Sequence, residues 1–585
     1  MEPAIRAERV EPEAAPRRRR RALLALLVFA AAVRLANLGA MSRLPIAEIQ
    51  LDWPDADMAF FYDWAGRILA GDVLGRDTPH PYKPWMAEVA PLETWERWWG
   101  GRQVFHSAPL FPYLLAGARR LVGDGFRAIA LLQLAVGVAG VWLVYRLAET
   151  WLGARAALFA GAISAVYSPG LLYESLALRD PLGATASLAL LLALSRCGPD
   201  ARTARWVVAG LLLAVALLAR EATTVFLPFL AVWLTWTFRA RPRRLPLAAL
   251  GFAGGALLGL APLIARNVAV GAPPLALSSV GTLGFVYGHV ADASPALFEL
   301  TPMARDVLLR SDGSFRAAVP LVWSTYGGDW WLLVSKEAER LAGALASFEP
   351  WDNANWYYFR ERSPMLRWAL PFDVVAALGI VGVWLTRRSP APLLLAFLAA
   401  SLATLAATSL VGRYRLPLVS VLCVYAGATV ARATHAASMR RWGDLAAVVL
   451  AVAILAAAAH VPLADLATNS RERPIEYALA ARTYLLAGDH DRAEAELVAG
   501  VRAAQTPARP ALVSDLDWKL AQALANDTCA RGRGAVAAQE LTALAAAYPQ
   551  DGRLERLLGL VYRDCLARPD EANRHFEGAQ RLGAP

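Results

Sequence analysis

Long apolar runs recur along this chain of 585 residues and limit what it can fold into. A helix needs about 20 apolar residues to cross a hydrocarbon layer roughly 30 Å thick, and about eleven runs come close to that length. The runs lie near residues 22–41, 126–148, 153–171, 181–196, 205–219, 221–238, 245–266, 369–386, 390–408, 412–433 and 443–461. We therefore predict an all-α, polytopic membrane protein with about eleven transmembrane helices.

The arginines predict how the chain crosses the membrane. The basic block Arg17–Arg21 directly precedes the first run, which favours an uncleaved anchor with residues 1–21 in the cytoplasm; a cleaved signal peptide is the alternative. The loops expected to face inward contain more arginines: Arg155, Arg196, Arg202, Arg205, Arg239, Arg241, Arg243, Arg244, Arg387, Arg388, Arg432, Arg440 and Arg441. The formal net charge of +10 then needs no nucleic-acid partner. The Ala/Arg/Leu-rich composition favours a bacterial inner membrane with a periplasmic outer face.

This topology divides the chain into a membrane domain, residues 22–461, and an outward-facing tail, residues 462–585. Residues 41–125 and 267–368 form two large outer loops. The tail has helical periodicity, and Leu558, Gly559, Tyr562, Pro569, Ala572, Phe576 and Ala579 follow the spacing of a tetratricopeptide repeat. Such repeats would recruit a protein partner, whereas a plain charged helical bundle is the alternative. Cys529 and Cys565 both face outward in this topology, so they either form a disulfide or stay free thiols.

Four carboxylates follow the first membrane run: Asp52, Asp55, Asp57 and Asp63. A carboxylate at the membrane surface can act as general base toward a hydroxyl, and two neighbouring carboxylates can bind Mg²⁺ or Mn²⁺. Asp57 can equally be the N-cap of an amphipathic helix whose Phe61 and Trp64 lie in the membrane interface.

Several other polar residues are candidates for substrate binding. Outward arginines oppose the usual charge bias, and guanidinium groups bind phosphate well, so Arg413, Arg415 and Arg266 are candidate lipid-phosphate ligands. Arg179 and Arg220 have acidic neighbours and are expected to form local ion pairs. Further candidate substrate contacts are His106, Tyr62, Asn353, Asn355 and Tyr357. The last three belong to an aromatic and amide-rich stretch that suits either a sugar or the membrane interface.

Three motifs together resemble the GT-C glycosyltransferases, in the bacterial branch related to protein O-mannosyltransferases and the lipid A aminoarabinose transferase. They are Y-D-W-A-x-x-I-x-x-G-D at 62–72, A-P-L-x-P-Y at 108–113 and R-Y-R-L-P at 413–417. The likeness covers about residues 20–435 and implies a GT-C-like membrane domain with interfacial loop helices and an outer active site.

The resemblance implies transfer of a sugar from a polyprenyl-phosphate donor to a hydroxyl on a glycan, lipid or protein, with inversion at the anomeric carbon. Asp57, with Asp55 as second choice, would be the base, and the R-Y-R arginines would bind the leaving phosphate. Many relatives have Asp-Glu where this chain has Asp57-Met58. A divalent cation at Asp55 and Asp57 is compatible with the sequence but not required by it.

Three other functions fit a chain of this kind. An O-antigen ligase or polymerase would use arginine and histidine of the second outer loop and would not need Asp57. A transporter would place charges inside its spans, whereas here ionisable groups other than Arg34 gather at span ends. A catalytically inactive scaffold would only present the tail.

Overall fold

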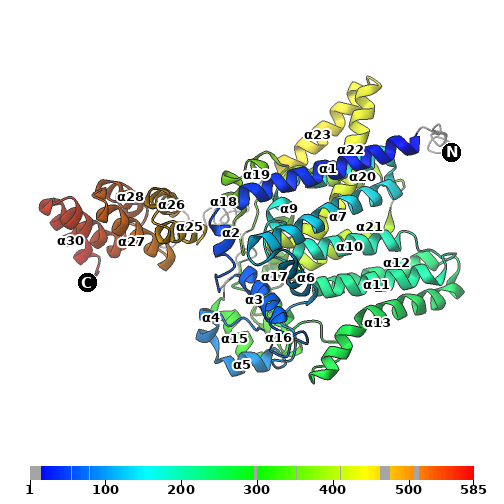
Figure 1. The fold of residues 1–585 in the computed structure, drawn as a ribbon, viewed down its shortest axis with the longest axis horizontal. Helices are drawn as coiled ribbons and strands as arrows, with labels where there is room; N and C mark the ends of the chain where they lie inside the picture. The colour runs from blue at the N-terminus through cyan, green and yellow to red at the C-terminus, as the bar shows by residue number, and fades with distance from the viewer. Residues whose placement is uncertain are drawn as a thin grey trace. The chain divides into compact units, whose positions relative to one another are not determined.

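The computed structural model describes residues 15–54, 56–77, 79–294, 300–350, 352–389, 391–408, 410–460, 475–505 and 513–584. These residues are helical and form no strand, apart from one isolated bridge between Tyr167 and Leu370, which confirms the all-α prediction. They divide into two compact units (Figure 1). The membrane unit contains Met1–Ala40, Pro54–Glu349 and Arg360–Val461, and the tail unit contains Met41–Trp53, Pro350–Phe359 and Pro462–Pro585.

The apolar helices of the membrane unit coincide with the predicted runs, so the chain is a polytopic helical membrane protein. Within the described residues, five stretches are long and apolar enough to cross a membrane: Arg17–Met41 in α1 (Ala15–Met41), α7 (Phe126–Leu152), η1 with α12 (Glu221–Phe238), η2 with α13 (Pro242–Ala269) and η3 with α22 (Gly412–Ser438). The shorter apolar helices are α8 (Ala154–Ala165), α10 (Asp180–Leu194), α11 (Thr203–Ala219), α20 (Phe372–Leu385), α21 (Pro392–Ala406) and α23 (Trp442–Ala458). The total of about eleven spans stays a prediction.

Small residues let neighbouring helices of the membrane unit approach closely. Helices α11 and α13 cross at Gly210 and Gly255, where an added Cβ would overlap the carbonyl oxygens of Phe252 and Val207. Glycine at these positions allows close backbone packing, which is the main attraction between helices surrounded by lipid. Helices α7, α10, α11 and α13 pack in that order (Figure 1).

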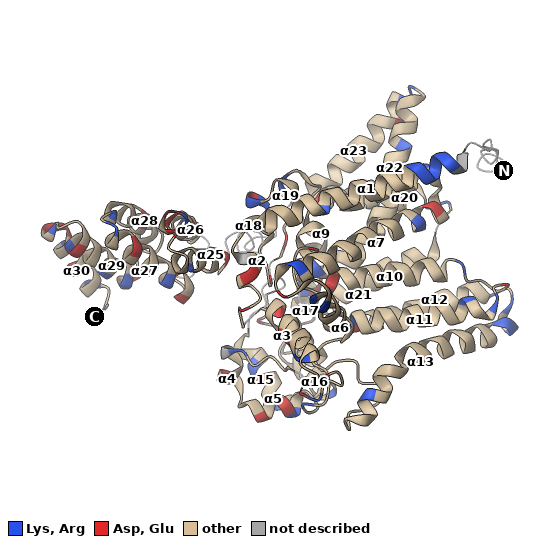
Figure 2. Cartoon of the chain, in the orientation of Figure 1, with Lys and Arg blue, Asp and Glu red and all other residues tan. Residues whose placement is uncertain are grey.

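Two loops predicted to face the cytoplasm lie together. Arg241 and Arg244, between α12 and α13, both bind Asp200, which precedes α11. Basic residues mark this turn and the N-terminal end of α1 (Figure 2). The arrangement agrees with the predicted topology, and the orientation in the membrane stays a prediction.

The first outer loop folds onto the membrane unit through α3 (Asp57–Leu69) and α6 (Leu110–Val122). Phe61 packs against Phe111 with ring centres 5.5 Å apart, and Trp64 packs against Phe105 at 5.1 Å. Phe61 and Trp64 are buried in the protein, so the expectation that they face the bilayer is wrong. The other helices between the apolar ones of this unit are α4 (Pro84–Val89), α5 (Leu92–Trp98), α9 (Ser168–Tyr173), α14 (Gly281–His289), α15 (Pro302–Ser311), α16 (Phe315–Ser324), α17 (Trp330–Leu345) and α19 (Pro364–Trp368).

The tail unit is built from helices that pack on their neighbours in sequence. Its helices are α2 (Ile46–Ile49), α18 (Trp356–Arg362), which runs on into the membrane unit, α25 (Ile475–Leu486), α26 (His490–Ala503), α27 (Asp515–Ala530), α28 (Gly534–Ala547), α29 (Gly552–Leu560), η4 (Val561–Cys565) and α30 (Pro569–Arg581). A disulfide joins Cys529 and Cys565, which resolves the alternative left open by the sequence. Stacked helix pairs are typical of helical repeats, and the tetratricopeptide assignment stays a prediction.

Candidate active site

Asp57 is the first residue of α3, and its side chain is bound by Arg413. The Arg413 Nη2 lies 2.7 Å from Asp57 Oδ2, although the two residues are 356 positions apart in sequence. Ala56, not Asp57, is the N-cap of α3, so the N-cap interpretation is wrong. A carboxylate in the first helical turn still interacts favourably with the helix dipole.

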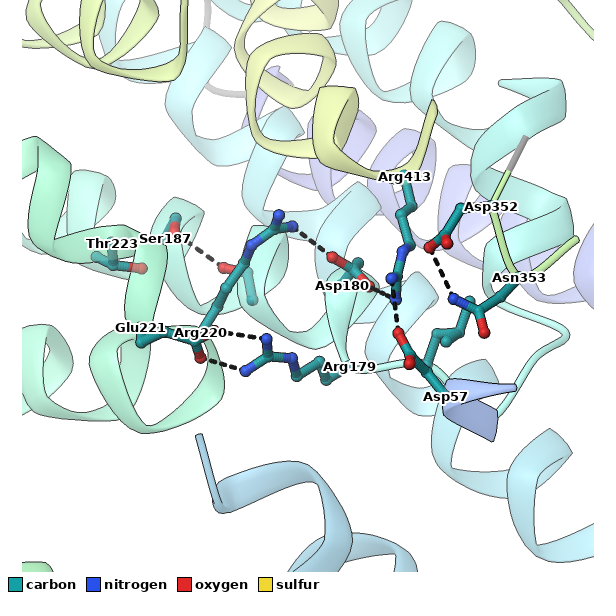
Figure 3. Close-up of polar contacts among 12 residues, drawn as sticks. Asp57, Arg179, Asp180, Ser187, Arg220, Glu221, Thr223, Asp352, Asn353 and Arg413 are labelled. Atoms are coloured by element: carbon teal, nitrogen blue, oxygen red, sulfur yellow. Dashed lines mark hydrogen bonds and ion pairs between the residues drawn. The ribbon is translucent and has the colours of Figure 1, made fainter. Parts of the chain in front are cut away.

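Arg413 also binds a second carboxylate. It lies in η3 (Gly412–Arg415), directly before α22 (Leu416–Ser438), and its Nη1 is 3.2 Å from Asp180 Oδ2. Asp180 is fully buried, and its Oδ1 accepts a hydrogen bond from Arg220 at 2.5 Å. Asp57, Arg413, Asp180 and Arg220 therefore alternate in charge along one row (Figure 3). The Tyr414 ring lies 4.4 Å from the Arg220 guanidinium carbon and 5.3 Å from that of Arg413.

A second ion pair lies beside this row. Arg179 binds Glu221 through both terminal nitrogens, with Nη2 at 2.6 Å from Oε1 (Figure 3). Glu221 also accepts a hydrogen bond from the Ala108 backbone at 3.3 Å, which ties the A-P-L-x-P-Y motif to this cluster. The sequence suggested pairs between chain neighbours, but the structure pairs Arg179 with Glu221 and Arg220 with Asp180.

The electrostatics keep Asp57 ionised. Burial disfavours its charge, but the Arg413 guanidinium, helped by Lys83 and Arg179, outweighs burial and holds the pKa of Asp57 well below its usual range. Asp57 is thus a weak base while Arg413 binds it. Its side chain remains 34% exposed, so a substrate hydroxyl can approach it.

His106 lies close to Asp57 but is neutral. Burial, with a smaller contribution from His80, lowers the pKa of His106 to about 3. Its ring packs among Phe60, His80 and Trp99, and its Nδ1 lies 3.4 Å from Ser279 Oγ. A neutral imidazole there can donate or accept a hydrogen bond but adds no positive charge.

The other predicted phosphate ligands bind main-chain carbonyls. Arg266 donates to the carbonyls of Leu74, Gly75 and Gln103, and so braces the first outer loop. Arg415 is completely buried and donates to the carbonyls of Gly343 and Phe348. It also forms an ion pair with Glu349 at 3.6 Å. This geometry gives both arginines a structural role, and phosphate binding by either stays a prediction.

The remaining candidates make contacts with other residues. The Tyr62 hydroxyl accepts a hydrogen bond from the Gly125 backbone at 2.6 Å, which joins α3 to the start of α7. Asn353, Asn355 and Tyr357 belong to the tail unit, where Asn353 donates to Asp352 and the Asn355 side chain accepts from the Tyr357 backbone. Asp55 lies outside the described residues.

A divalent cation does not fit the carboxylates that surround Arg413. No group of three or more His, Cys, Asp or Glu side chains suited to a metal occurs in the described part of the chain. Arg413 lies between Asp57 and Asp180 and neutralises both. A cation there would have to displace a guanidinium group.

Two members of the row, Asp180 and Arg220, were not predicted as site residues. The sequence does show Arg-Asp and Arg-Glu at the outer ends of two membrane helices, which was the available signal. Which acid pairs with which base depends on how α10, α12 and α22 pack, and no local pattern encodes that.

The fold and site define a polytopic helical membrane protein with a charged cluster at the ends of its spans. The model of the family described as dolichyl-phosphate-mannose-protein mannosyltransferase matches residues 106–265. That segment includes His106, Arg179, Asp180 and Glu221 but neither Asp57 nor Arg413. No curated protein matches the chain significantly.

Two solved structures are among those found to be similar to the chain. The oligosaccharyltransferase AglB from Archaeoglobus fulgidus, in complex with an inhibitory peptide and a dolichol-phosphate, is 15% identical with a TM-score of 0.40, covering 75% of this chain and 56% of that one. ArnT from Cupriavidus metallidurans, bound to undecaprenyl phosphate, is 14% identical with a TM-score of 0.42, covering 95% of this chain and 76% of that one. The chain thus spans about half the length of the archaeal enzyme.

Proposed function

We propose that this protein is a membrane glycosyltransferase that moves a sugar from a polyprenyl-phosphate carrier to a hydroxyl acceptor. The observation that supports this most is the Asp57–Arg413 pair, because it combines a partly exposed carboxylate with a guanidinium at the end of a membrane helix. A base for the acceptor and a cation for the leaving group are the two parts that such a transfer requires. The family match over residues 106–265 supports the same reaction class.

In this mechanism Asp57 takes the proton of the acceptor hydroxyl. The acceptor oxygen attacks the anomeric carbon and forms the new glycosidic bond, while the bond from that carbon to the phosphate oxygen breaks. The phosphate oxygen keeps the electron pair, and Arg413 stabilises its growing negative charge, with Arg220 close by. Attack opposite the leaving group inverts the configuration. The proton ends on the Asp57 carboxyl.

Donor binding would activate the base. Both terminal nitrogens of Arg413 are bound to carboxylates, at 2.7 Å to Asp57 and 3.2 Å to Asp180. A carrier phosphate that binds Arg413 competes with Asp57 for the same donor. Asp57 then loses the contact that suppresses its basicity, so the base becomes effective after the donor is in place.

The finer features of the proposal rest on the sequence. The outer face is periplasmic, the membrane is the bacterial inner membrane, and the acceptor is a glycan, lipid or protein. The tail unit, with its tetratricopeptide-like helices and its disulfide, would bind a protein partner. A ligase or polymerase of lipid-linked glycans is the alternative, and it would leave Asp57 dispensable.

The test is release of polyprenyl phosphate from radiolabelled polyprenyl-phosphate sugars by purified protein in nanodiscs, with membrane extract as acceptor. We expect wild type to release the carrier phosphate and Arg413→Ala to lose donor binding. Asp124→Asn is the matched control, because Asp124 is an exposed outer-loop carboxylate paired with Arg119 at 2.6 Å, and it should behave as wild type. Equal release by wild type, Asp57→Asn and Arg413→Ala would refute the site.

A further inference from the structure

An open cleft of about 350 Å³ lies on the first outer loop. This volume is near the lower end of pockets that bind small molecules, which is about 300 Å³. The cleft is lined by α3, by the segment before α4 and by α5. Its charged and imidazole side chains are Asp63, Arg67, Asp77, His80, Glu96 and Arg102.

The cleft adjoins the candidate active site. Pro54 and Ala59 flank Asp57 in the chain, and Phe60 lies one helical turn after it, on the same side of α3. The Phe60 and His80 rings both contact the His106 ring, with centres 5.7 Å apart in each case. A molecule in the cleft can therefore extend one group toward Asp57.

Carboxylates and guanidinium groups both line the cleft. Arg67 binds Asp63 at 3.0 Å and Asp77 at 2.9 Å, and Arg102 binds Glu96 at 2.6 Å. All of these side chains are partly exposed, so their remaining lone pairs and N–H groups can reach a ligand. Ion pairs at this exposure add little stability by themselves.

His80 adds an imidazole to the cleft lining. Its Nε2 lies 3.0 Å from the Val104 carbonyl oxygen, and the Arg102 backbone also contacts the ring. Burial lowers the pKa of His80, so the ring is neutral and can donate or accept a hydrogen bond with a ligand hydroxyl.

We propose that this cleft binds a short, hydroxyl-rich saccharide as the acceptor of the proposed transfer, with one hydroxyl directed to Asp57. The assignment rests on the proposed function. Sugar hydroxyls both donate and accept, so they can bind the carboxylates and the guanidinium groups of the cleft, and the Phe60 and Tyr82 rings can cover the apolar face of a sugar. A hydroxyl-bearing peptide is the competing occupant, and the experiment distinguishes it from a saccharide.

The test is saturation-transfer-difference NMR on the full-length protein in nanodiscs, without donor. The probes are free trisaccharides of glucose, N-acetylglucosamine and mannose, together with a serine- and threonine-rich peptide. We expect at least one trisaccharide to bind wild type, and Arg67→Ala and Arg102→Ala each to weaken its binding about tenfold. Arg310→Ala is the control, because Arg310 forms a surface i,i+4 ion pair with Asp306 outside the cleft, as Arg67 does with Asp63 inside it.

Three results would overturn the proposal: no trisaccharide binds folded wild type, both cleft variants bind as wild type does, or only the peptide binds. Because the measurement needs no turnover, it separates two failures. Saccharide binding without donor consumption would leave the cleft assignment intact and refute the transferase. Donor consumption without saccharide binding would support the transferase and refute the cleft assignment.

Discussion

Replacing Asp57 with asparagine should move carrier binding and sugar transfer in opposite directions. The carboxylate competes with the carrier phosphate for Arg413, so its removal frees that guanidinium. Asp57 is about one-third exposed, and solvent screening limits such a pair to about 1 kcal/mol. At 1.4 kcal/mol per tenfold, undecaprenyl phosphate should bind Asp57→Asn up to about fivefold more tightly than wild type.

Transfer by the same variant should fall about 10²- to 10⁴-fold, because a general base contributes that much. Binding is measured by titrating undecaprenyl phosphate into protein in nanodiscs, and transfer by release of carrier phosphate from a labelled donor. The fold should survive, since Arg413 keeps Asp180 and α3 keeps its buried Phe61 and Trp64. Weaker carrier binding by folded Asp57→Asn, or transfer within threefold of wild type, would refute the reasoning.

Three predictions concern stability. Gly255→Ala should lower the free energy of unfolding by about 1–3 kcal/mol, because the added methyl group overlaps α11. Gly254→Ala is the control, since Gly254 has open space around it, and its thermal midpoint should be nearly that of wild type. Equal midpoints for the two variants would contradict the close crossing of α11 and α13. Burial raises the pKa of Glu349 to about 7, so the unfolded chain releases this proton at a lower pH than the folded chain. The free energy of unfolding should therefore fall as the pH rises from about 5 to about 8. Glu349→Gln should weaken this pH dependence of the thermal midpoint in thermal scans. Reducing the Cys529–Cys565 disulfide, which closes a 36-residue separation, should destabilise the tail unit by about 4 kcal/mol in denaturant titrations, and an unchanged midpoint would contradict this.

The helical membrane fold was predictable because the requirements of a lipid bilayer can be read directly from the sequence. A spanning helix needs a long apolar run, and arginines at its ends indicate which side faces inward. The amphipathic pattern of α3 was ambiguous in this respect. Phe61 and Trp64 suited either the lipid interface or a protein partner, and the Phe111 and Phe105 rings on distant segments decided for the protein.

The candidate site was predictable only in part. Asp57 stood out as part of an acidic cluster after the first apolar run, and Arg413 as an outward arginine against the usual charge bias. The structure brings the two together. Arg415 and Arg266 had the same signal but bind carbonyls of the outer loops. The difference is one of side-chain direction after folding, which a sequence pattern does not specify. The pairing of Arg220 with Asp180 likewise depends on packing between helices.

The most direct test of the central claim follows the lipid carriers in cells of the source organism. Mass spectrometry should compare polyprenyl-phosphate sugars in cells lacking the protein with cells that express wild type or Asp57→Asn. We predict that one polyprenyl-phosphate sugar accumulates without the protein, returns to its normal level with wild type and stays high with Asp57→Asn. The same carrier profile in all three strains would contradict a lipid-linked sugar transferase with Asp57 as its base.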